Sequence, residues 1–380
     1  MTEAAGALSF DVSRLPQLYQ PDTARIDLAR RRQAAVWRGE TPDRWPLLLN
    51  GPLAPGQQAI PAPNFKEAFY DADLMLCSGV RAACGAAAGA SDAVPSMRAN
   101  MGTGTLPACL GLEQRVFEDK MPWLRERLTR AQAAKLQPDD IRVRGAFERG
   151  LDAMRRVREI MGDALPVYCM DTQGPLDLAH LLIGDDLFYA LIDDPPFVHH
   201  LMEICLELGI RGHAWMKEVA GEPRDRHYHG NALYAENMGV RICEDTTVML
   251  GPDAVAEFAV PYTRRLAQHF GGAWIHYCGR RDHLTEMMLD IPEVRGINFG
   301  HLPRNKDAHV LEEDMRRVLA RGKVYFGGWP RDPGESGRDY LRRMHRWAAE
   351  GCMILNGGAA IGGDHGFDGP ADALDFWYGL

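Results

Sequence analysis

The stretch "AWIHYCGRRDHLTEMMLDIPEVRGINFG" (273–300) places two short apolar runs on either side of an amphipathic segment. The runs at 273–279 and 294–300 have the length and composition of buried strands. The segment between them has apolar residues mostly at helical spacing and ends near a proline, Pro292. A strand, a helix and a second strand in this order predict two parallel strands joined by a crossover helix.

The same alternation of strand and helix recurs along most of the chain. Eight apolar runs of strand type lie at 45–50, 93–102, 165–172, 239–245, 273–279, 294–300, 323–328 and 352–358. No Gly-x-Gly-x-x-Gly turn follows the first run, which argues against a doubly wound sheet. The sequence therefore predicts an α/β fold, a (β/α)₈ TIM barrel formed by residues 45–380.

Two segments add to this barrel. Residues 1–44 precede the first run and contain a basic helix that ends near Gly39 and Pro42, which predicts an N-terminal helical extension that caps the barrel. Residues 186–239 lie between the third and fourth runs, where two helices and a loop rich in glycine and histidine predict a helical insertion.

The composition excludes several classes of protein. Hydrophobic residues make up 46% and charged residues 25% of the 380, which is typical of a globular protein. The net charge of −9 and the absence of a Lys/Arg-rich run argue against a nucleic-acid partner. No export signal or apolar stretch of membrane-spanning length is present, so we expect a cytoplasmic protein without membrane contact. The eight cysteines form no Cys-x-x-Cys pair, and most are expected to be reduced core residues.

Barrel enzymes carry their chemistry at the carboxyl ends of the strands. His276 and Cys278 stand two residues apart at the end of the fifth run, so they face the same side of the strand, and Gly279 follows directly. They are either ligands of one metal ion or a buried polar pair. Other polar residues that close the runs are candidates for substrate or metal contact: Asn100, Asp171, Gln173, Glu244, Asp245, His301 and Asn356.

The order of four segments resembles the uroporphyrinogen decarboxylase superfamily over nearly the whole chain. The segments are "RRQAAVWRGETPDRWPLL" (31–48), "GPLDLAHLLIGDDLFYALIDDPPFVHHLMEICLELG" (174–209), "EDTTVMLGPDAVAEFAVPYTRRL" (244–266) and "HYCG" (276–279). The resemblance implies a (β/α)₈ barrel. The Arg-rich signature of the decarboxylase itself is replaced by "NGPLAPGQQ" (50–58), so in its motifs the chain is most similar to the zinc-dependent, corrinoid-linked methyltransferase branch.

In that branch a His-x-Cys motif after the fifth strand binds zinc, and here His276 and Cys278 match it. The branch has a further cysteine ligand after the eighth strand, where this chain has Ala359 in "ILNGGAAIGG" (354–363). Cys352 begins the eighth run and is expected at the other end of the barrel. Asp245 and Glu244 are the residues expected to complete the site, because the fourth strand lies beside the fifth.

The resemblance implies a methyltransferase that exchanges a methyl group between a corrinoid-binding protein and a small thiol, ether or amine, with zinc as cofactor. In this interpretation Asp171, Asp245 and His276 are the catalytic candidates, and Asn100, Gln173, His301 and Asn356 contact the substrate. A homodimer is one assembly open to the chain, whose oligomeric state the sequence does not determine. Two alternatives stay open: a metal-free decarboxylase or lyase that acts on a small carboxylated substrate through Asp171, Asp245 and His276, and a binding protein that has lost the ligand set.

Overall fold

A computed structural model describes residues 10–230, 232–300, 309–361 and 366–380 of the protein. At its centre lies a parallel sheet whose six strands follow the order β1-β10-β9-β8-β7-β6. These strands are β1 (Leu47–Leu48), β6 (Val240–Cys243), β7 (Ala273–Cys278), β8 (Val294–Gly300), β9 (Val324–Gly327) and β10 (Met353–Asn356). Each lies within one of the predicted runs, so the α/β fold with a parallel central sheet is confirmed.

The predicted second and third strands (93–102 and 165–172) are not regular strands. Among the described residues they share one isolated parallel bridge, between Met97 and Val167. Pro95 and Pro166 lie inside these runs and have no backbone N–H to donate, which prevents a continuous ladder of hydrogen bonds.

Hydrogen bonds from residues next to these two segments nevertheless attach them to the edges of the sheet. The backbone N–H of Asp92 donates to the carbonyl of Leu47 in β1, at 3.1 Å, and that of Gly174 donates to the carbonyl of Cys243 in β6, at 2.6 Å. The two irregular segments therefore lie between the edge strands β6 and β1, an arrangement consistent with a TIM barrel.

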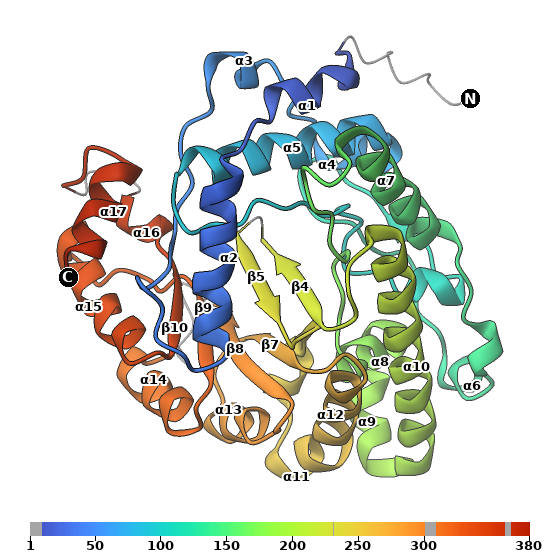
Figure 1. Ribbon diagram of the computed structural model, residues 1–380. Helices are drawn as coiled ribbons and strands as arrows, with labels where there is room; N and C mark the ends of the chain where they lie inside the picture. The colour runs from blue at the N-terminus through green and yellow to red at the C-terminus, as the bar shows by residue number, and fades with distance from the viewer. Residues whose placement is uncertain (1–9, 231, 301–308, 362–365) are drawn as a thin grey trace.

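Helices surround the strands, as the ring of coiled ribbons in Figure 1 shows. The longer ones are α5 (Ala72–Ala88), α7 (Gly145–Met161), α8 (Pro175–Ile183), α9 (Asp186–Asp193), α10 (Pro195–Ala220), α12 (Val260–His269), α13 (Asp282–Leu289), α14 (Leu311–Ala320), α15 (Gly337–Ala349) and α17 (Pro370–Tyr378). Their ends follow the local sequence. In α10, Asp194 caps the first turn by accepting from the backbone of Phe197, Pro195 occupies the first position, and Gly221 ends the helix with a φ of 68°.

Shorter elements connect or extend this framework: η1 (Val12–Arg14), α1 (Leu15–Leu18), α3 (Pro55–Gln58), α4 (Phe65–Tyr70), η2 (Pro107–Leu110), β2 (Gln114–Arg115), β3 (Trp123–Leu124), α6 (Arg130–Ala133), η3 (Pro138–Asp140), η4 (Asp245–Met249), α11 (Pro252–Ala254), η5 (Val255–Ala259) and α16 (Gly358–Ile361).

The glycine- and histidine-rich segment predicted as a loop forms a β-hairpin. It follows α10 and consists of β4 (Arg226–His229) paired antiparallel with β5 (Leu233–Glu236). In Figure 1 the hairpin occupies the middle of the molecule, in front of β7 and β8. Leu233 and Ala235 of the hairpin belong to a buried apolar cluster with Trp274 and Val324, which lie at the starts of β7 and β9. The hairpin therefore covers the amino ends of the strands.

The N-terminal helix α2 (Thr23–Trp37) lies beside this hairpin (Figure 1). The Gln33 side chain donates to the carbonyl of Ala232 at 2.9 Å and accepts from the backbone N–H of Tyr234 at 2.8 Å. The indole of Trp37 donates to the carbonyl of Tyr234 at 3.1 Å. These contacts attach the N-terminal segment to the end of the sheet opposite to the carboxyl ends of the strands.

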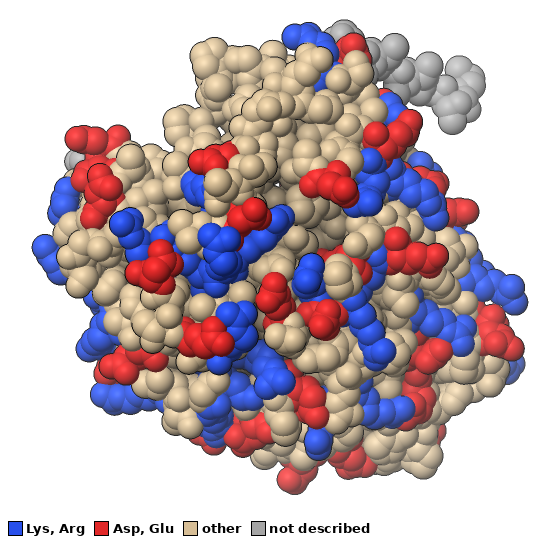
Figure 2. All heavy atoms as spheres, in the orientation of Figure 1, with Lys and Arg blue, Asp and Glu red and all other residues tan. Residues whose placement is uncertain are grey.

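Acidic and basic side chains lie among one another over the face shown in Figure 2. Within the described ranges, no helix is both long enough and apolar enough to cross a bilayer.

Candidate metal centre

The candidate site lies at the carboxyl ends of β6 and β7, called the mouth below. The two strands pair in parallel with Arg241 opposite Trp274 and Cys243 opposite His276. Because side chains alternate along a strand, Cys243 and Arg241 point to one face of the sheet, as do Cys278, His276 and Trp274.

Cys243, Asp245 and His276 form a cluster of potential metal ligands. One donor atom from each lies within 4.8 Å of the other two. His276 Nε2 is 3.8 Å from Asp245 Oδ1 and 3.5 Å from Cys278 Sγ. In a tetrahedral zinc site with nitrogen, oxygen and sulfur ligands, neighbouring donor atoms are about 3.3 to 3.8 Å apart. The observed separations at His276 are of this size.

The side chain of Asn298 orients His276. Its Nδ2 donates to the carbonyl of Phe326, and its Oδ1 is therefore turned towards Nδ1 of His276. Nδ1 is the donor in that contact, which leaves the lone pair on Nε2, the atom that faces Asp245 and Cys278. Burial and the nearby Arg241 guanidinium lower the pKa of His276, so the imidazole is neutral and able to bind a metal ion.

Burial and the Asp245 carboxylate raise the pKa of the Cys278 thiol to about 11, and burial raises that of Cys243 well above its ordinary value. Both thiols are therefore protonated at neutral pH unless a cation is bound beside them. The backbone N–H of Cys278 also holds the Asp245 carboxylate, at 2.7 Å from Oδ1. The sulfur, carboxylate and imidazole of Cys243, Asp245 and His276 match the donor types that zinc prefers, so this group fits the ion that the sequence predicts. Cys278 Sγ contacts His276 but is not a member of that group.

Glu244, predicted as a further ligand, lies on the opposite face of β6. It is fully buried, and its Oε1 accepts from the Thr263 hydroxyl at 3.0 Å. Burial and the nearby Asp177 carboxylate raise its pKa. Glu244 directly follows the last residue of β6, and its carboxylate is turned to Thr263 of α12, away from the donor atoms of Cys243 and Asp245.

Asp171, predicted as catalytic, forms two ion pairs in the interior. Its Oδ1 accepts from Arg98 Nη1 at 3.2 Å and from Arg241 Nη1 at 2.9 Å. Burial alone would raise the pKa of Asp171, but the two guanidinium groups outweigh it and the pKa is lowered. The carboxylate is thus held in its ionised form.

The predicted substrate-binding residues have different positions. Gln173 lines a cavity at the mouth, described below. Asn100 has a buried Oδ1 without a hydrogen-bond partner within the described part of the chain. Asn356 is exposed, and its Oδ1 accepts from the backbone of Gly358 at 3.3 Å. His301 lies outside the described residues.

Ala359 and Cys352 lie as the sequence predicts. Ala359 is in the short helix α16, directly after β10, where the related methyltransferases are expected to have a cysteine. Cys352 is buried and immediately precedes β10, with its thiol 3.3 Å from the carbonyl of Trp347. Neither residue contributes a ligand to the cluster at the mouth.

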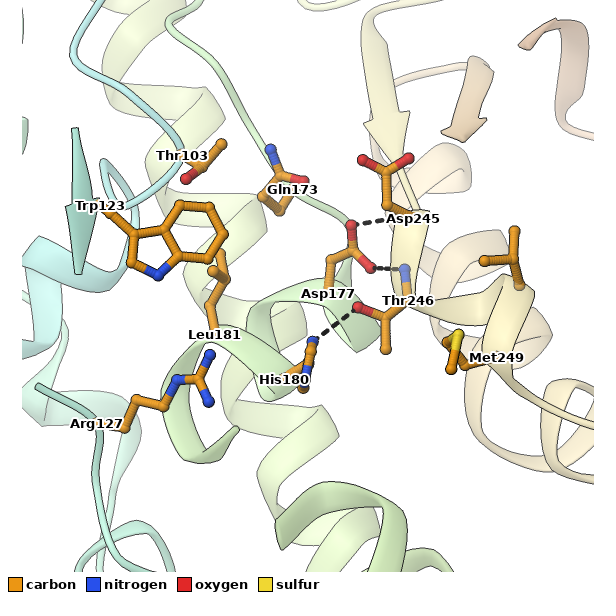
Figure 3. Close-up of a pocket in the computed structure, with 11 residues that line it drawn as sticks. Thr103, Trp123, Arg127, Gln173, Asp177, His180, Leu181, Asp245, Thr246 and Met249 are labelled. Carbon is orange, nitrogen blue, oxygen red and sulfur yellow. Dashed lines mark hydrogen bonds between the residues drawn. The ribbon is translucent and has the colours of Figure 1, made fainter. Parts of the chain in front are cut away.

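A cavity of about 320 Å³ adjoins the cluster. It lies between the first turns of α8, η4 and the segment around β3, and is lined by Thr103, Trp123, Arg127, Gln173, Asp177, His180, Leu181, Asp245, Thr246, Val248 and Met249. Figure 3 shows Trp123 and Met249 on opposite sides, with Asp177 between them. Asp245 belongs to both the cavity and the cluster, so a molecule in the cavity would lie next to the metal ligands.

The polar wall of this cavity is built around Asp177. Its carboxylate accepts from the backbone N–H groups of Asp245 at 2.8 Å and Thr246 at 2.6 Å, and His180 Nδ1 lies 3.1 Å from the Thr246 hydroxyl (Figure 3). Burial and the Asp245 charge raise the pKa of Asp177 to about 7.

Several residues at the mouth were not predicted from the sequence: Cys243, Asn298, Arg98, Arg241 and Asp177. A signal for some of them is present. Arg241 and Cys243 alternate with Asp245 in "GVRICED" (239–245), and Arg98 stands two residues before Asn100, so shared faces could have been inferred. Asn298 and Asp177 have no comparable signal.

Comparisons with known proteins agree with this architecture. The sequence model of the uroporphyrinogen decarboxylase (URO-D) family matches residues 28–214. A methyltransferase from Methanosarcina mazei has a similar structure, with a TM-score of 0.62 over 92% of this chain and 96% of its own, at 16% sequence identity. At that identity the similarity concerns the fold. No curated protein matches the sequence significantly.

Proposed function

We propose that the chain is a zinc-dependent methyltransferase, which exchanges a methyl group between a corrinoid-binding protein and a small thiol, ether or amine. The match of residues 28–214 to the uroporphyrinogen decarboxylase family model and the fold shared with a methyltransferase support this proposal. The observation that carries this proposal is the cluster of Cys243, Asp245 and His276, with Cys278 Sγ in contact with His276. The donor set differs from that of the related methyltransferases, because Cys243 on the neighbouring strand stands in for the cysteine that Ala359 replaces.

The residues of the site have distinct tasks in this proposal. His276, Cys278, Cys243 and Asp245 would hold zinc, whose chemistry when bound is to keep a thiol substrate ionised or to polarise the heteroatom that leaves. Asn298 fixes the tautomer of His276, and the Cys278 backbone N–H fixes the Asp245 carboxylate. These two contacts define the geometry of the ligands before any ion binds.

The cavity beside Asp245 supplies the place for the substrate. Leu181, Val248 and the Trp123 ring give it apolar walls, whereas Gln173 and Asp177 give it polar groups that would orient a small molecule. Trp123 and Met249 are 49% and 70% exposed, which leaves apolar surface at the entrance for the corrinoid-binding partner. We also propose that residues 1–44 act as a cap on the barrel of residues 45–380, supported by the contacts of Gln33 with the hairpin.

A metal-free decarboxylase or lyase is the second candidate, and one observation favours it. Arg98 and Arg241 bring positive charge into the interior of the mouth, where a carboxylated substrate would be attracted. The ion pairs of Asp171 suit an electrostatic role for this residue, because a carboxyl held in its ionised form is a poor proton donor.

Zinc content separates the two candidates. Protein purified without a histidine tag should contain one zinc ion per chain, and Cys278→Ser should lower the zinc content and abolish methyl transfer from methylcobalamin to a thiol, with melting behaviour nearly unchanged. Cys205→Ser is the matched control, because Cys205 is buried in α10 and belongs to no ligand cluster among the described residues. Full activity after zinc has been removed would contradict the methyltransferase proposal and favour the metal-free candidate.

A further inference from the structure

Two arginines and one aspartate meet below the metal cluster. Arg98 and Arg241 both donate to Asp171 Oδ1. Arg241 precedes Cys243 by two residues on the same face of β6, which places it about 7 Å deeper than the cluster along the strand. The two guanidinium groups share a single carboxylate, so this group of three residues has a net positive charge.

The side of this group away from the mouth is closed. The Arg241 guanidinium lies 5.7 Å above the centre of the Trp274 ring, and the His229 ring of the hairpin packs against that ring at 5.0 Å. His229 is neutral, because burial and the two arginines lower its pKa well below the ordinary value. The Arg98 side chain remains 24% exposed, so a small anion can reach its guanidinium from solvent.

Both arginines have hydrogen-bond donors to spare. Arg241 Nε is buried and has no hydrogen-bond partner among the described residues. Arg98 uses only Nη1 in a hydrogen bond within the described ranges, although a guanidinium has five N–H groups. A buried donor without an acceptor is unfavourable, and an anion is the partner that a guanidinium binds best.

We propose that Arg98 and Arg241 form a subsite for the carboxylate of a small organic anion that enters from the mouth. The subsite consists of protein groups only and binds its ligand with or without zinc. In the proposed methyltransferase this subsite would hold the anionic end of the substrate while the reacting heteroatom reaches the metal cluster above it. The assignment of the anion as the substrate therefore rests on the proposed function.

Binding of benzoate and of its neutral isostere benzamide tests the subsite. Both affinities are measured by isothermal titration calorimetry on chelator-treated, zinc-free protein at 150 mM salt. We expect the wild type to bind benzoate at least about tenfold more tightly than benzamide, since the charge-assisted contacts require the anion. Equal affinities would overturn the proposal, because a purely structural ion-pair group does not distinguish the two compounds.

Arg98→Gln should weaken benzoate binding about tenfold and leave benzamide binding unchanged. The control is Arg155→Gln, which removes the same charge from the exposed surface of α7. An unchanged benzoate affinity in Arg98→Gln, or an equal loss in Arg155→Gln, would overturn the proposal. If Arg98→Gln does not fold, Arg98→Lys decides: it retains the charge but loses the forked donors, so an unchanged benzoate affinity would again overturn the subsite.

Zinc content of the protein as purified, measured before the chelator treatment, keeps the two proposals distinguishable. Wild-type protein that contains no zinc as purified, and whose chelator-treated form prefers benzoate, would support the subsite while the methyltransferase proposal fails. Protein that contains zinc as purified, and whose chelator-treated form shows no preference for benzoate, would overturn the subsite and leave the methyltransferase proposal standing.

Discussion

Asn298 Oδ1 accepts a hydrogen bond from His276 Nδ1, while the amide of Asn298 is itself held by the carbonyl of Phe326. This relationship aims the free lone pair of His276 at Asp245 and Cys278. It connects β8 and β9 to the ligands on β6 and β7, so four adjacent strands of the sheet determine the geometry of one imidazole.

We therefore expect Asn298→Ala to lower zinc affinity by about 10- to 100-fold, because a metal-binding histidine without its oriented partner loses its preferred tautomer and position. Asn298→Asp keeps an acceptor for Nδ1 but loses the donor to the Phe326 carbonyl, so its zinc affinity should lie between those of the wild type and Asn298→Ala. Competition with a chromophoric chelator measures both. Asn356→Ala, at the exposed end of β10, is the control, and a loss there as large as in Asn298→Ala would contradict the specific role.

Asp245→Asn and Glu244→Gln form a matched pair at adjacent positions. Asp245→Asn should lower the zinc content, because the amide is a much weaker ligand than the carboxylate. Glu244→Gln should retain full zinc content, since Glu244 faces Thr263 on the other side of β6. Metal analysis of both purified variants is the measurement. Equal zinc loss in the two variants would show that Glu244, like Asp245, faces the metal site, contrary to the structure.

Cys243→Ser tests the ligand that the sequence did not predict. The substitution conserves the size of the side chain but replaces the sulfur, so the zinc content should fall as in Cys278→Ser. Full zinc content in Cys243→Ser, together with loss in Cys278→Ser, would reduce the ligand set to His276, Cys278 and Asp245.

Cys352→Ala should leave zinc content and activity unchanged. Cys352 is buried immediately before β10, away from the mouth, so its truncation removes only packing and is expected to cost about 1 kcal/mol of unfolding free energy. Urea unfolding and metal analysis check the two parts. Zinc loss in this variant would show that the start of β10 lies nearer to the metal ligands than the structure has it.

His213 in α10 should make the protein sensitive to acid. It is buried, donates from Nδ1 to the Gly209 carbonyl at 2.7 Å, and its Nε2 has no partner within the described part of the chain. Burial, with the nearby Lys217 charge, lowers the pKa of His213 to about 4, against about 6.5 for an unfolded histidine. Since the unfolded chain binds the proton first, the stabilisation is complete above pH 6.5 and is lost as the pH falls from 6.5 towards 4.

Between pH 7.5 and pH 5 this histidine alone should therefore lower the unfolding free energy by about 2 kcal/mol. In His213→Gln the fall in unfolding free energy between the two pH values should be smaller than in the wild type by about this amount, whatever the stability of the variant at neutral pH. Urea unfolding at the two pH values measures the difference. An identical loss in the variant and the wild type would show that His213 does not titrate as its surroundings indicate.

The alternation of apolar runs and helical segments in the sequence determines much of the fold by itself. All six sheet strands lie within predicted runs, and His276 and Cys278 share a face because residues two apart on a strand must do so. The irregular segments around Met97 and Val167 were harder to predict. Pro95 and Pro166 have no backbone N–H, and this disrupts strand pairing only where a neighbouring strand would accept a hydrogen bond at that position. The boundary between residues 1–44 and 45–380 stays a prediction.

Only the tertiary structure decided which residues meet at the mouth. In the predicted strand 239–245, alternation places Cys243 and Asp245 on one face and Glu244 on the other, but it does not say which face is turned to the mouth, and in the structure the strand ends at Cys243. That choice comes from burial on both sides of β6 and from its register with β7, which brings Cys243 level with His276.

The same holds for Arg98, Asp171 and Arg241. About 70 residues separate Arg98 from Asp171, and about 70 more separate Asp171 from Arg241. The three side chains meet because their segments of the chain approach one another in the interior, near β6. Spacing along a sequence reports only local periodicity, whereas contacts over such separations arise from the packing of the whole sheet with its helices, and for that reason only the folded chain reveals them.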